Sequence, residues 1–239
     1  MEILEKLKAF DKGQIIEAIA IQERLQYFSI PFSEAKFAPQ YHQTILDKIE
    51  RKISNKRAFN TFKENIQYPL STCEFIGTIF TSLSKVFTGD GKTIEFYPQG
   101  NYKTLGFQYL QDKIWDRFIV APNTLIVTTK EKDVTKRFFV DITCVEYIEC
   151  EENDITAFAY KNGQEIIYID STSVYKLKDN RIIDEQKHNF GFCPVAFISN
   201  MKLSHKKPLI RINPIVKSLG KIEELFIVST QSNIINRHI

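Results

Sequence analysis

Apolar side chains in the first third of the chain recur at the three- and four-residue spacings that gather them on one face of an α-helix. The pattern predicts helices over 13–28 and 41–59. A third helix is predicted over 71–87, where Ser71 and Glu74 have the spacing of a capping box. The chain is therefore expected to begin with several helices.

From Phe118 onward the pattern changes to short runs rich in β-branched and aromatic residues, separated by turn residues. Such runs are typical of strands. Strands are expected over 118–129, 137–148, 155–160, 165–170 and 173–178. The Asn162–Gly163 pair favours a type I′ hairpin, and 178–181 is a second candidate turn. Consecutive hairpins form an antiparallel meander, so the predicted fold class is α+β.

Two further helices are expected, one of them over 101–118. The other follows Asn213, a candidate N-cap, and has Pro214 at the first helical position, which proline favours. Its apolar residues follow a 4-3-4 spacing and form one stripe: Ile215, Leu219, Ile222 and Phe226. A helix with one apolar face needs a surface to pack on. That surface is either the chain's own core or a neighbouring subunit.

These patterns divide the chain into three consecutive parts. Residues 1–90 are expected to form a helical region, and 91–200 an α+β region that contains the meander. Residues 201–239 are expected to form a basic loop and a long amphipathic helix.

Positive charge is concentrated in the last of these parts. The formal net charge of the chain is +3, but residues 202–239 alone carry +5. The most basic stretch contains Lys202, Lys206, Lys207 and Arg211. It suits contact with DNA phosphates, contact with an acidic neighbouring subunit, or a solvated loop. No aromatic residue is interleaved, so a platform that stacks single-stranded bases is not expected.

No motif in the sequence indicates a metal or a cofactor. The four cysteines lack a CxxC spacing, and the four histidines form no HxxxH or HxH pair. The acidic residues between 146 and 154 lack the alternation of a calcium-binding loop and are expected to form a solvated connection. The fragment "TGDGKT" has Val86 where a phosphate-binding loop requires glycine. Neither a metal nor a cofactor is therefore expected.

Cys193 is the remaining candidate nucleophile. A reactive thiol needs a nearby base and a lowered pKa, and the position of His188 five residues upstream supplies neither by itself. Pro194 favours an extended backbone at Cys193 and marks the start of a strand. We expect Cys193 to be a small buried apolar residue, and the protein not to be an enzyme. A hydrolase built on this thiol or on the acidic residues is the alternative, and it requires thiol- or metal-dependent turnover.

The stretch "HNFGFCPVAFISN" resembles the H-x-x-G-x-x-P-V-x-x-x-x-N segment that closes the wing region of tailed-phage portal proteins. The matching residues are His188, Gly191, Pro194, Val195 and Asn200. The order of elements over about 70–239 is also similar, with an antiparallel region before this segment and a long helix after it. In this role Gly191 permits a turn, and Pro194 fixes the start of a core strand.

This resemblance implies a structural protein, the head–tail connector of a phage. Portal subunits form cyclic rings, usually of about twelve copies, at one capsid vertex, and the double-stranded genome passes through the ring during packaging and ejection. The implied partners are further copies of the chain, the major capsid protein, a head–tail adaptor, the terminase motor and DNA. The implied location is the virion, and the host cytoplasm during assembly. The last helix and its stripe are then candidates for the contact between subunits.

Portal subunits usually continue into stem helices, a clip and a crown, so the chain is expected to be the N-terminal, wing-containing portion or a truncated relative. The competing hypothesis is a nucleic-acid-binding accessory protein that uses 202–211, with duplex binding that weakens steeply in salt. The sequence contains neither a signal-peptide apolar core nor a run long enough to span a bilayer. A soluble protein without a membrane partner is therefore expected.

Overall fold

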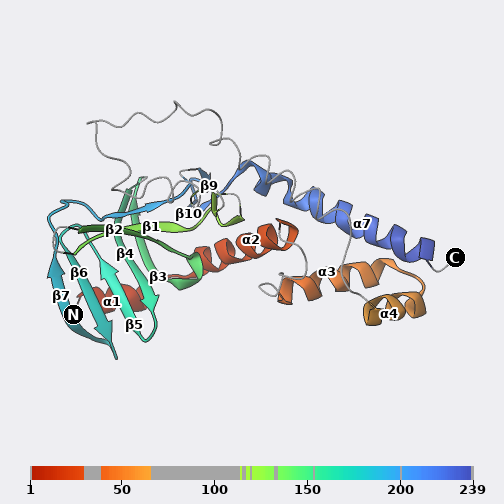
Figure 1. The fold of residues 1–239 in the computed structure, drawn as a ribbon, viewed down its shortest axis with the longest axis horizontal. Helices are drawn as coiled ribbons and strands as arrows, with labels where there is room; N and C mark the ends of the chain where they lie inside the picture. Colours follow the sequence, from red (N-terminus) through yellow and green to blue (C-terminus); the bar gives the residue numbers. More distant parts are fainter. Residues whose placement is uncertain are drawn as a thin grey trace. The chain divides into compact units, whose positions relative to one another are not determined.

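A computed structural model of the chain describes residues 2–29, 39–65, 114, 117–118, 120–131, 134–152, 154–199 and 201–237 (Figure 1). The predicted helix over 71–87 and its capping box lie outside the described residues, as do the TGDG turn and most of the helix predicted over 101–118. The fold class is α+β, as predicted. N-terminal helices are followed by antiparallel sheets, one of them a five-stranded meander, and then by a C-terminal helix.

The chain divides into two compact units. Unit 1 combines residues 1–20 with 101–213, and unit 2 combines 21–100 with 214–239. Both units are therefore assembled from segments that are distant in the sequence, and they do not coincide with the three consecutive parts that the sequence pattern suggests. The boundary near the N-terminus falls inside one helix, α2 (Gly13–Ser29).

The other N-terminal helices are α1 (Glu2–Ala9), α3 (Pro39–Lys52) and α4 (Lys56–Asn65). The single helix predicted over 41–59 is thus two helices. The break occurs at 53–55, where the Asn55 side chain accepts a hydrogen bond from the backbone N–H of Ala58 at 3.0 Å. Asparagine satisfies the free N–H groups at a helix start better than it propagates a helix, which is why α4 begins anew here.

The meander of unit 1 consists of β3 (Val145–Glu151), β4 (Asp154–Asn162), β5 (Glu165–Ile169), β6 (Ser173–Lys178) and β7 (Arg181–Lys187). All neighbours pair antiparallel in chain order, and Figure 1 shows the five strands side by side. The connections between successive strands are only a few residues long, and connections of this length join antiparallel strands.

Two hairpin turns of the meander contain residues that tolerate positive φ. Asp179 and Asn180 have φ of 50° and 58°, the combination typical of a type I′ turn. In the hairpin between β4 and β5, Asn162 pairs with Glu165, so the turn residues are Gly163 and Gln164. Only Gly163 has positive φ there, at 64°, which is typical of type II′. The predicted hairpin is therefore present, but its turn is shifted by one residue and is of a different type.

A second sheet of unit 1 has the order β2–β1–β8, formed by β1 (Leu125–Glu131), β2 (Val134–Val140) and β8 (Val195–Phe197). The strand predicted over 137–148 is interrupted by a 3-10 turn at Ile142–Cys144. Asp141 causes the interruption, because its carboxylate accepts the N–H of Thr143 at 2.9 Å and caps the turn. The predicted run at 118–129 likewise becomes a strand only at Leu125, since Phe118 and Val120 are helical.

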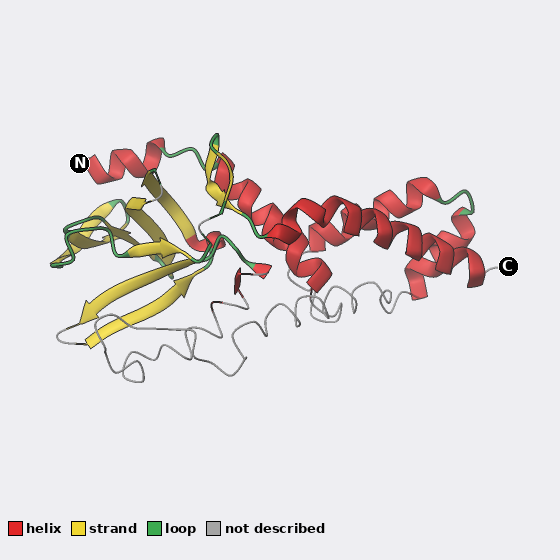
Figure 2. Cartoon of the chain, turned by 90° about the horizontal axis from the view of Figure 1, so that it is seen from above, coloured by secondary structure: helices red, strands yellow, loops and turns green. Residues whose placement is uncertain are grey.

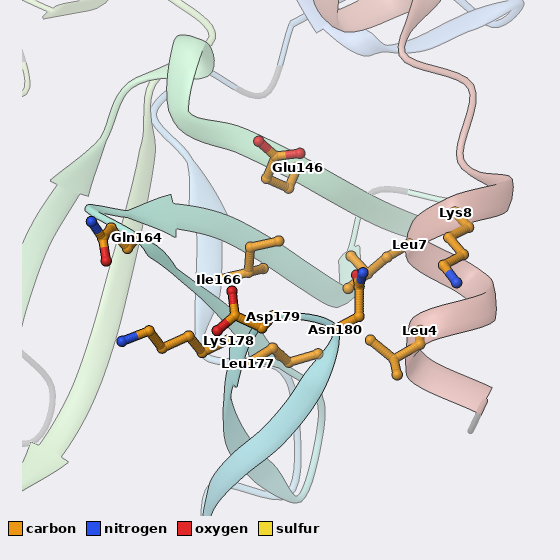
Figure 3. Close-up of a pocket in the computed structure, with 10 residues that line it drawn as sticks. All are labelled: Leu4, Leu7, Lys8, Glu146, Gln164, Ile166, Leu177, Lys178, Asp179 and Asn180. Carbon is orange, nitrogen blue, oxygen red and sulfur yellow. The ribbon is translucent and has the colours of Figure 1, made fainter.

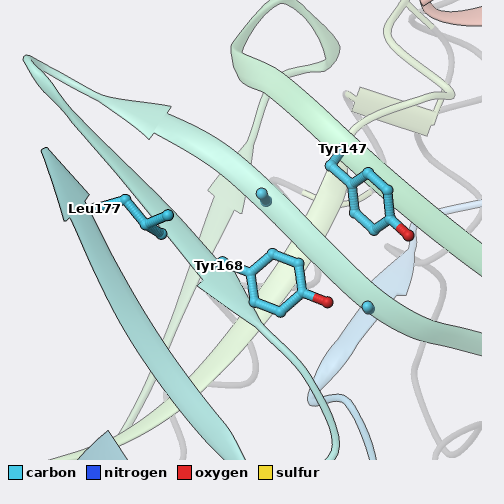
Figure 4. Packing of buried hydrophobic residues seen from close by; sticks show 5 residues of the cluster. Tyr147, Tyr168 and Leu177 are labelled. Carbon is cyan, nitrogen blue, oxygen red and sulfur yellow. The ribbon is translucent and has the colours of Figure 1, made fainter. Parts of the chain in front are cut away.

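One face of the meander forms an aromatic core. Tyr147, Tyr168 and Leu177 come from three different strands and share this face (Figure 4). Helix α1 covers it with apolar side chains that include Leu4 and Leu7. Figure 2 shows α1 next to the strands of unit 1. The alternation of side chains along each strand gathers these residues on one side of the sheet.

The core of unit 2 forms where α3 and α4 contact α7 (Leu219–Arg237). The Phe226 ring lies 6.0 Å from Tyr27 and 5.6 Å from Phe28, with edge-to-face geometry. The α-helix begins later than the sequence suggests, because residues Pro214–Ser218 form a 3-10 helix. None of the described helices combines the length and apolarity that crossing a membrane requires.

Candidate functional site

The segment between β7 and β8 forms an ordered turn. Gly191 has φ of 74°, in the left-handed region, so a side chain would be strained although nothing occupies the space around it. The backbone N–H of His188 donates to Thr172 O at 2.8 Å. At the other end, Pro194 O accepts the N–H of Thr128 at 2.9 Å, which joins the turn to β1. The segment thus carries the chain from the edge of the meander to the second sheet. Asn200, the last residue of the motif, lies outside the described residues.

Cys193 is buried in this turn, with 4% of its surface exposed. Its thiol donates to Ile169 O at 3.6 Å. Burial, together with the negative charge of Asp170, raises the pKa of Cys193 to about 12. The thiol therefore stays protonated at neutral pH, which disfavours a nucleophilic role.

The basic stretch forms a hairpin of β9 (Lys202–Ser204) and β10 (Lys207–Arg211) in unit 1. Lys202 donates its Nζ to the backbone oxygen of Glu152. Lys207 forms an ion pair with Glu17 of α2 at 2.6 Å. Lys206 is exposed at the hairpin turn. The lysines thus differ in how much of their charge is available to a partner.

Arg211 does not belong to the exposed basic surface, contrary to its inclusion among the DNA- or subunit-contacting residues. It is 1% exposed, and its guanidinium lies 4.0 Å from the centroid of the Phe197 ring. Burial lowers the pKa of Arg211. The side chain of Asn123 forms two hydrogen bonds with the backbone of Arg211. Arg211 N–H donates to Asn123 Oδ1 at 2.7 Å, and Asn123 Nδ2 donates to Arg211 O at 3.3 Å. Arg211 is therefore a core residue of unit 1.

The acidic residues between 146 and 154 separate into two groups. Glu146 pairs with Lys12, and Glu149 pairs with Lys6 at 3.5 Å. Three other acidic side chains are exposed at the turn between β3 and β4: Glu151, Glu152 and Asp154. Among the residues that the structure describes, no group of histidine, cysteine, aspartate or glutamate side chains is arranged to hold a metal.

A cavity of about 310 Å³ lies between α1 and the meander (Figure 3). Leu4 and Leu7 from α1 face Ile166 and Leu177 of the sheet across it. Charged residues of both signs border this apolar part: Lys8, Glu146, Lys178 and Asp179. Because two positive and two negative residues border the cavity, it does not favour a ligand of one charge.

Unit 2 contains a basic groove of about 680 Å³ between α2, α3 and α7, which the charge pattern of the sequence does not predict. At its base the buried carboxylate of Glu223 accepts Arg24 Nη2 at 3.1 Å and also Lys48 Nζ. Arg51 and Lys52 line the groove and are exposed. The one signal in the sequence is that Glu223 occupies a position on the apolar stripe of α7, four residues after Leu219 and three before Phe226.

The stripe predicted on the last helix lies partly inside the chain's own core. Leu219 and Phe226 are each 2% exposed, and Ile215 and Ile222 are half-buried. Among the α7 side chains that the structure describes, the large apolar ones that are exposed are instead Leu225 and Val228, at 56% and 52%. These two are the better candidates for a contact with another molecule.

No protein-family model matches this chain, and no curated protein matches it. The described residues offer three features on which a function can be argued. One is the turn at 188–194, the second is the β9–β10 hairpin, and the third is the basic groove of unit 2. The first orders the backbone, and the other two present charge.

Proposed function

We propose that the chain is the wing-containing part of a tailed-phage portal subunit, a structural protein that forms a ring at one capsid vertex. The observation that carries this proposal is the order of elements. The meander β3–β7 is followed by the turn at 188–194, by strand β8, by the basic hairpin and by the long helix α7. The portal segments that the sequence resembles occur in the same order.

The turn supports the proposal at the level of its residues, because three residues of the motif hold the backbone. His188 donates its N–H to Thr172, and Gly191 has a left-handed φ. Pro194 accepts a hydrogen bond from Thr128. A segment held at both ends keeps the strands before and after it in a fixed relation. Subunits of a ring need such rigidity, because small errors at each contact accumulate around the ring.

In this role the partners are further copies of the chain, the major capsid protein, a head–tail adaptor and the terminase. The double-stranded genome passes through the ring, and the protein resides in the virion after assembly in the host cytoplasm. The chain acts without a cofactor and catalyses no reaction.

Native mass spectrometry of the protein isolated from its natural source tests this proposal. A closed assembly of about twelve copies is expected, and negative-stain images of the same sample should show rings. A protein that stays monomeric at micromolar concentration in low and moderate salt would contradict the proposal. Duplex binding by that monomer would favour the nucleic-acid-binding alternative instead.

A further inference from the structure

We infer that the basic groove of unit 2 binds the acidic β3–β4 turn of a second copy of this chain. The inference rests on the proposed self-assembly and names one contact within it. The groove is defined by Arg24, Lys48, Arg51, Lys52, Gly220, Glu223, Glu224 and Ile227. The acidic turn is defined by Glu151, Glu152 and Asp154.

The groove carries positive charge that its own carboxylates do not balance. Glu223 forms ion pairs with both Arg24 and Lys48, so its negative charge offsets part of the positive charge of these two residues within unit 2. Arg51 and Lys52 have no ion pair within the described part of the chain, and both are exposed. With four basic and two acidic lining residues, the groove has a net charge of +2.

The acidic turn is complementary to it in charge, and its described residues are held by backbone contacts. Glu151 pairs with Asp154 at the end of the hairpin, so the connection between the two strands is short. Glu152 has φ of 53°, which is unusual for a residue other than glycine or asparagine. Lys202 donates to the backbone oxygen of Glu152 and leaves its carboxylate exposed.

A protein partner fits the groove better than a nucleic acid does. The net charge of the groove, +2, is small for a surface that binds a phosphate backbone, and the apolar residue Ile227 lines it together with the charged residues. Val228 lies one helical turn beyond Glu224 on α7, and both Val228 and Leu225 are exposed apolar residues. Protein interfaces combine apolar contacts with a charged rim, whereas nucleic-acid surfaces are dominated by positive charge.

A second copy of the chain is the partner that the structure itself supplies. The groove belongs to unit 2 and the turn to unit 1, so every copy offers two different, complementary surfaces. Contacts between two different surfaces join subunits head to tail, and such contacts close into a ring when the rotation between neighbours permits it.

Reciprocal charge reversal tests the inference in the full chain. One variant carries Arg51→Glu and Lys52→Glu in the groove, and the other carries Glu151→Lys and Glu152→Lys in the turn. Each variant alone sets like charges against each other, and its self-association should weaken about tenfold or more. A mixture of the two restores opposite charges at every contact and should assemble as the wild type does. Sedimentation velocity at about 100 mM salt measures both results.

The matched control is Lys56→Glu with Arg57→Glu on α4, which changes the net charge of unit 2 equally but lies outside the groove. It should assemble as the wild type does. Thermal unfolding by circular dichroism checks that each variant folds. If a reversal unfolds the protein, the neutral pair Arg51→Gln and Lys52→Gln replaces it, with a smaller weakening expected.

The remaining outcomes distinguish the two proposals. If the wild type assembles and the reversals have no effect, or the mixture fails to restore assembly, the groove–turn contact is wrong and the portal proposal stands. If the wild type never assembles, both are wrong. If the groove variant loses affinity for a 20-base-pair duplex while the turn variant assembles normally, the groove binds nucleic acid and the inference is overturned.

Discussion

Among single residues, Cys193 and Glu223 show two ways in which a chain accommodates an ionisable group in its interior. Cys193 remains neutral, since burial raises its pKa to about 12. The Glu223 carboxylate is instead surrounded by donors from Arg24 and Lys48. Neither solution is visible in the local sequence, because both depend on segments distant along the chain.

The raised pKa of Cys193 predicts a loss of stability in alkali. In the unfolded chain the thiol releases its proton near pH 9.0, and in the folded chain only near pH 12. Between these values the unfolded state holds fewer protons, so the free energy of unfolding falls by roughly 1 kcal/mol per pH unit for this group. Urea unfolding at about pH 8 and pH 10 measures the fall, which Cys193→Ala should reduce. An equal fall in that variant would show that other groups cause it.

Glu223 is predicted to stabilise unit 2. Glu223→Gln removes the charge that two cations share, and we expect the free energy of unfolding to fall by about 1–2 kcal/mol. The value is moderate because Arg24 and Lys48 are 32% and 42% exposed and are partly solvated. Glu224→Gln, next along the helix but 66% exposed, is the control and should change stability by less than about 0.5 kcal/mol. Equal effects in chemical denaturation would contradict the prediction.

At the level of the elements, side chains hold neighbouring segments together where strand pairing ends. Asn123 lies just before β1 and forms two hydrogen bonds with the backbone of Arg211 at the end of β10. It is fully buried, so these bonds have no competition from water. Asn55 and Asp141 act differently, since their side chains end one element and begin the next.

Asn123→Ala is expected to lower the free energy of unfolding by about 2 kcal/mol, because it removes two buried hydrogen bonds to the backbone of Arg211. Thermal and urea unfolding measure the change. Asn189→Ala, at an exposed position, is the control and should have little effect. A loss below about 0.5 kcal/mol in Asn123→Ala would mean that the two segments are held by other contacts.

The β3–β4 turn is predicted to be strained at Glu152. Replacement by asparagine, which tolerates the left-handed region, should raise the free energy of unfolding by about 0.5–1 kcal/mol. The contact with Lys202 uses the backbone of Glu152 and is therefore retained. Glu151→Asn, in a strand with extended backbone, should give no such gain. A destabilised Glu152→Asn variant would show that the carboxylate itself supports the turn.

For the whole molecule, the feature that bears on assembly is that the two units carry surfaces of opposite charge. Unit 2 presents a basic groove and unit 1 presents an acidic turn. Exposed ion pairs contribute modestly to affinity but strongly to the choice and orientation of partners. In the proposed assembly, such a contact is expected to orient the subunits, and burial of exposed apolar residues such as Leu225 and Val228 is expected to add affinity.

Self-association of the wild type should therefore weaken as salt is raised from about 50 to 500 mM, since the Debye length shortens over this range. Sedimentation velocity at several salt concentrations measures the effect. The reciprocal mixture of charge-reversed chains should show the same dependence. Assembly that strengthens with salt would indicate a contact dominated by apolar burial.

Local patterns in the sequence were sufficient for the α+β class, for the antiparallel meander and for the turn at Asp179–Asn180. These features depend on periodicity and on residues that tolerate positive φ, which act over a few neighbouring positions. The tertiary structure alone decided the burial of Arg211, the groove around Glu223 and the division into two discontinuous units. Each of these arises where segments distant in the sequence meet, and there burial and pairing decide whether a charge faces the solvent or the core.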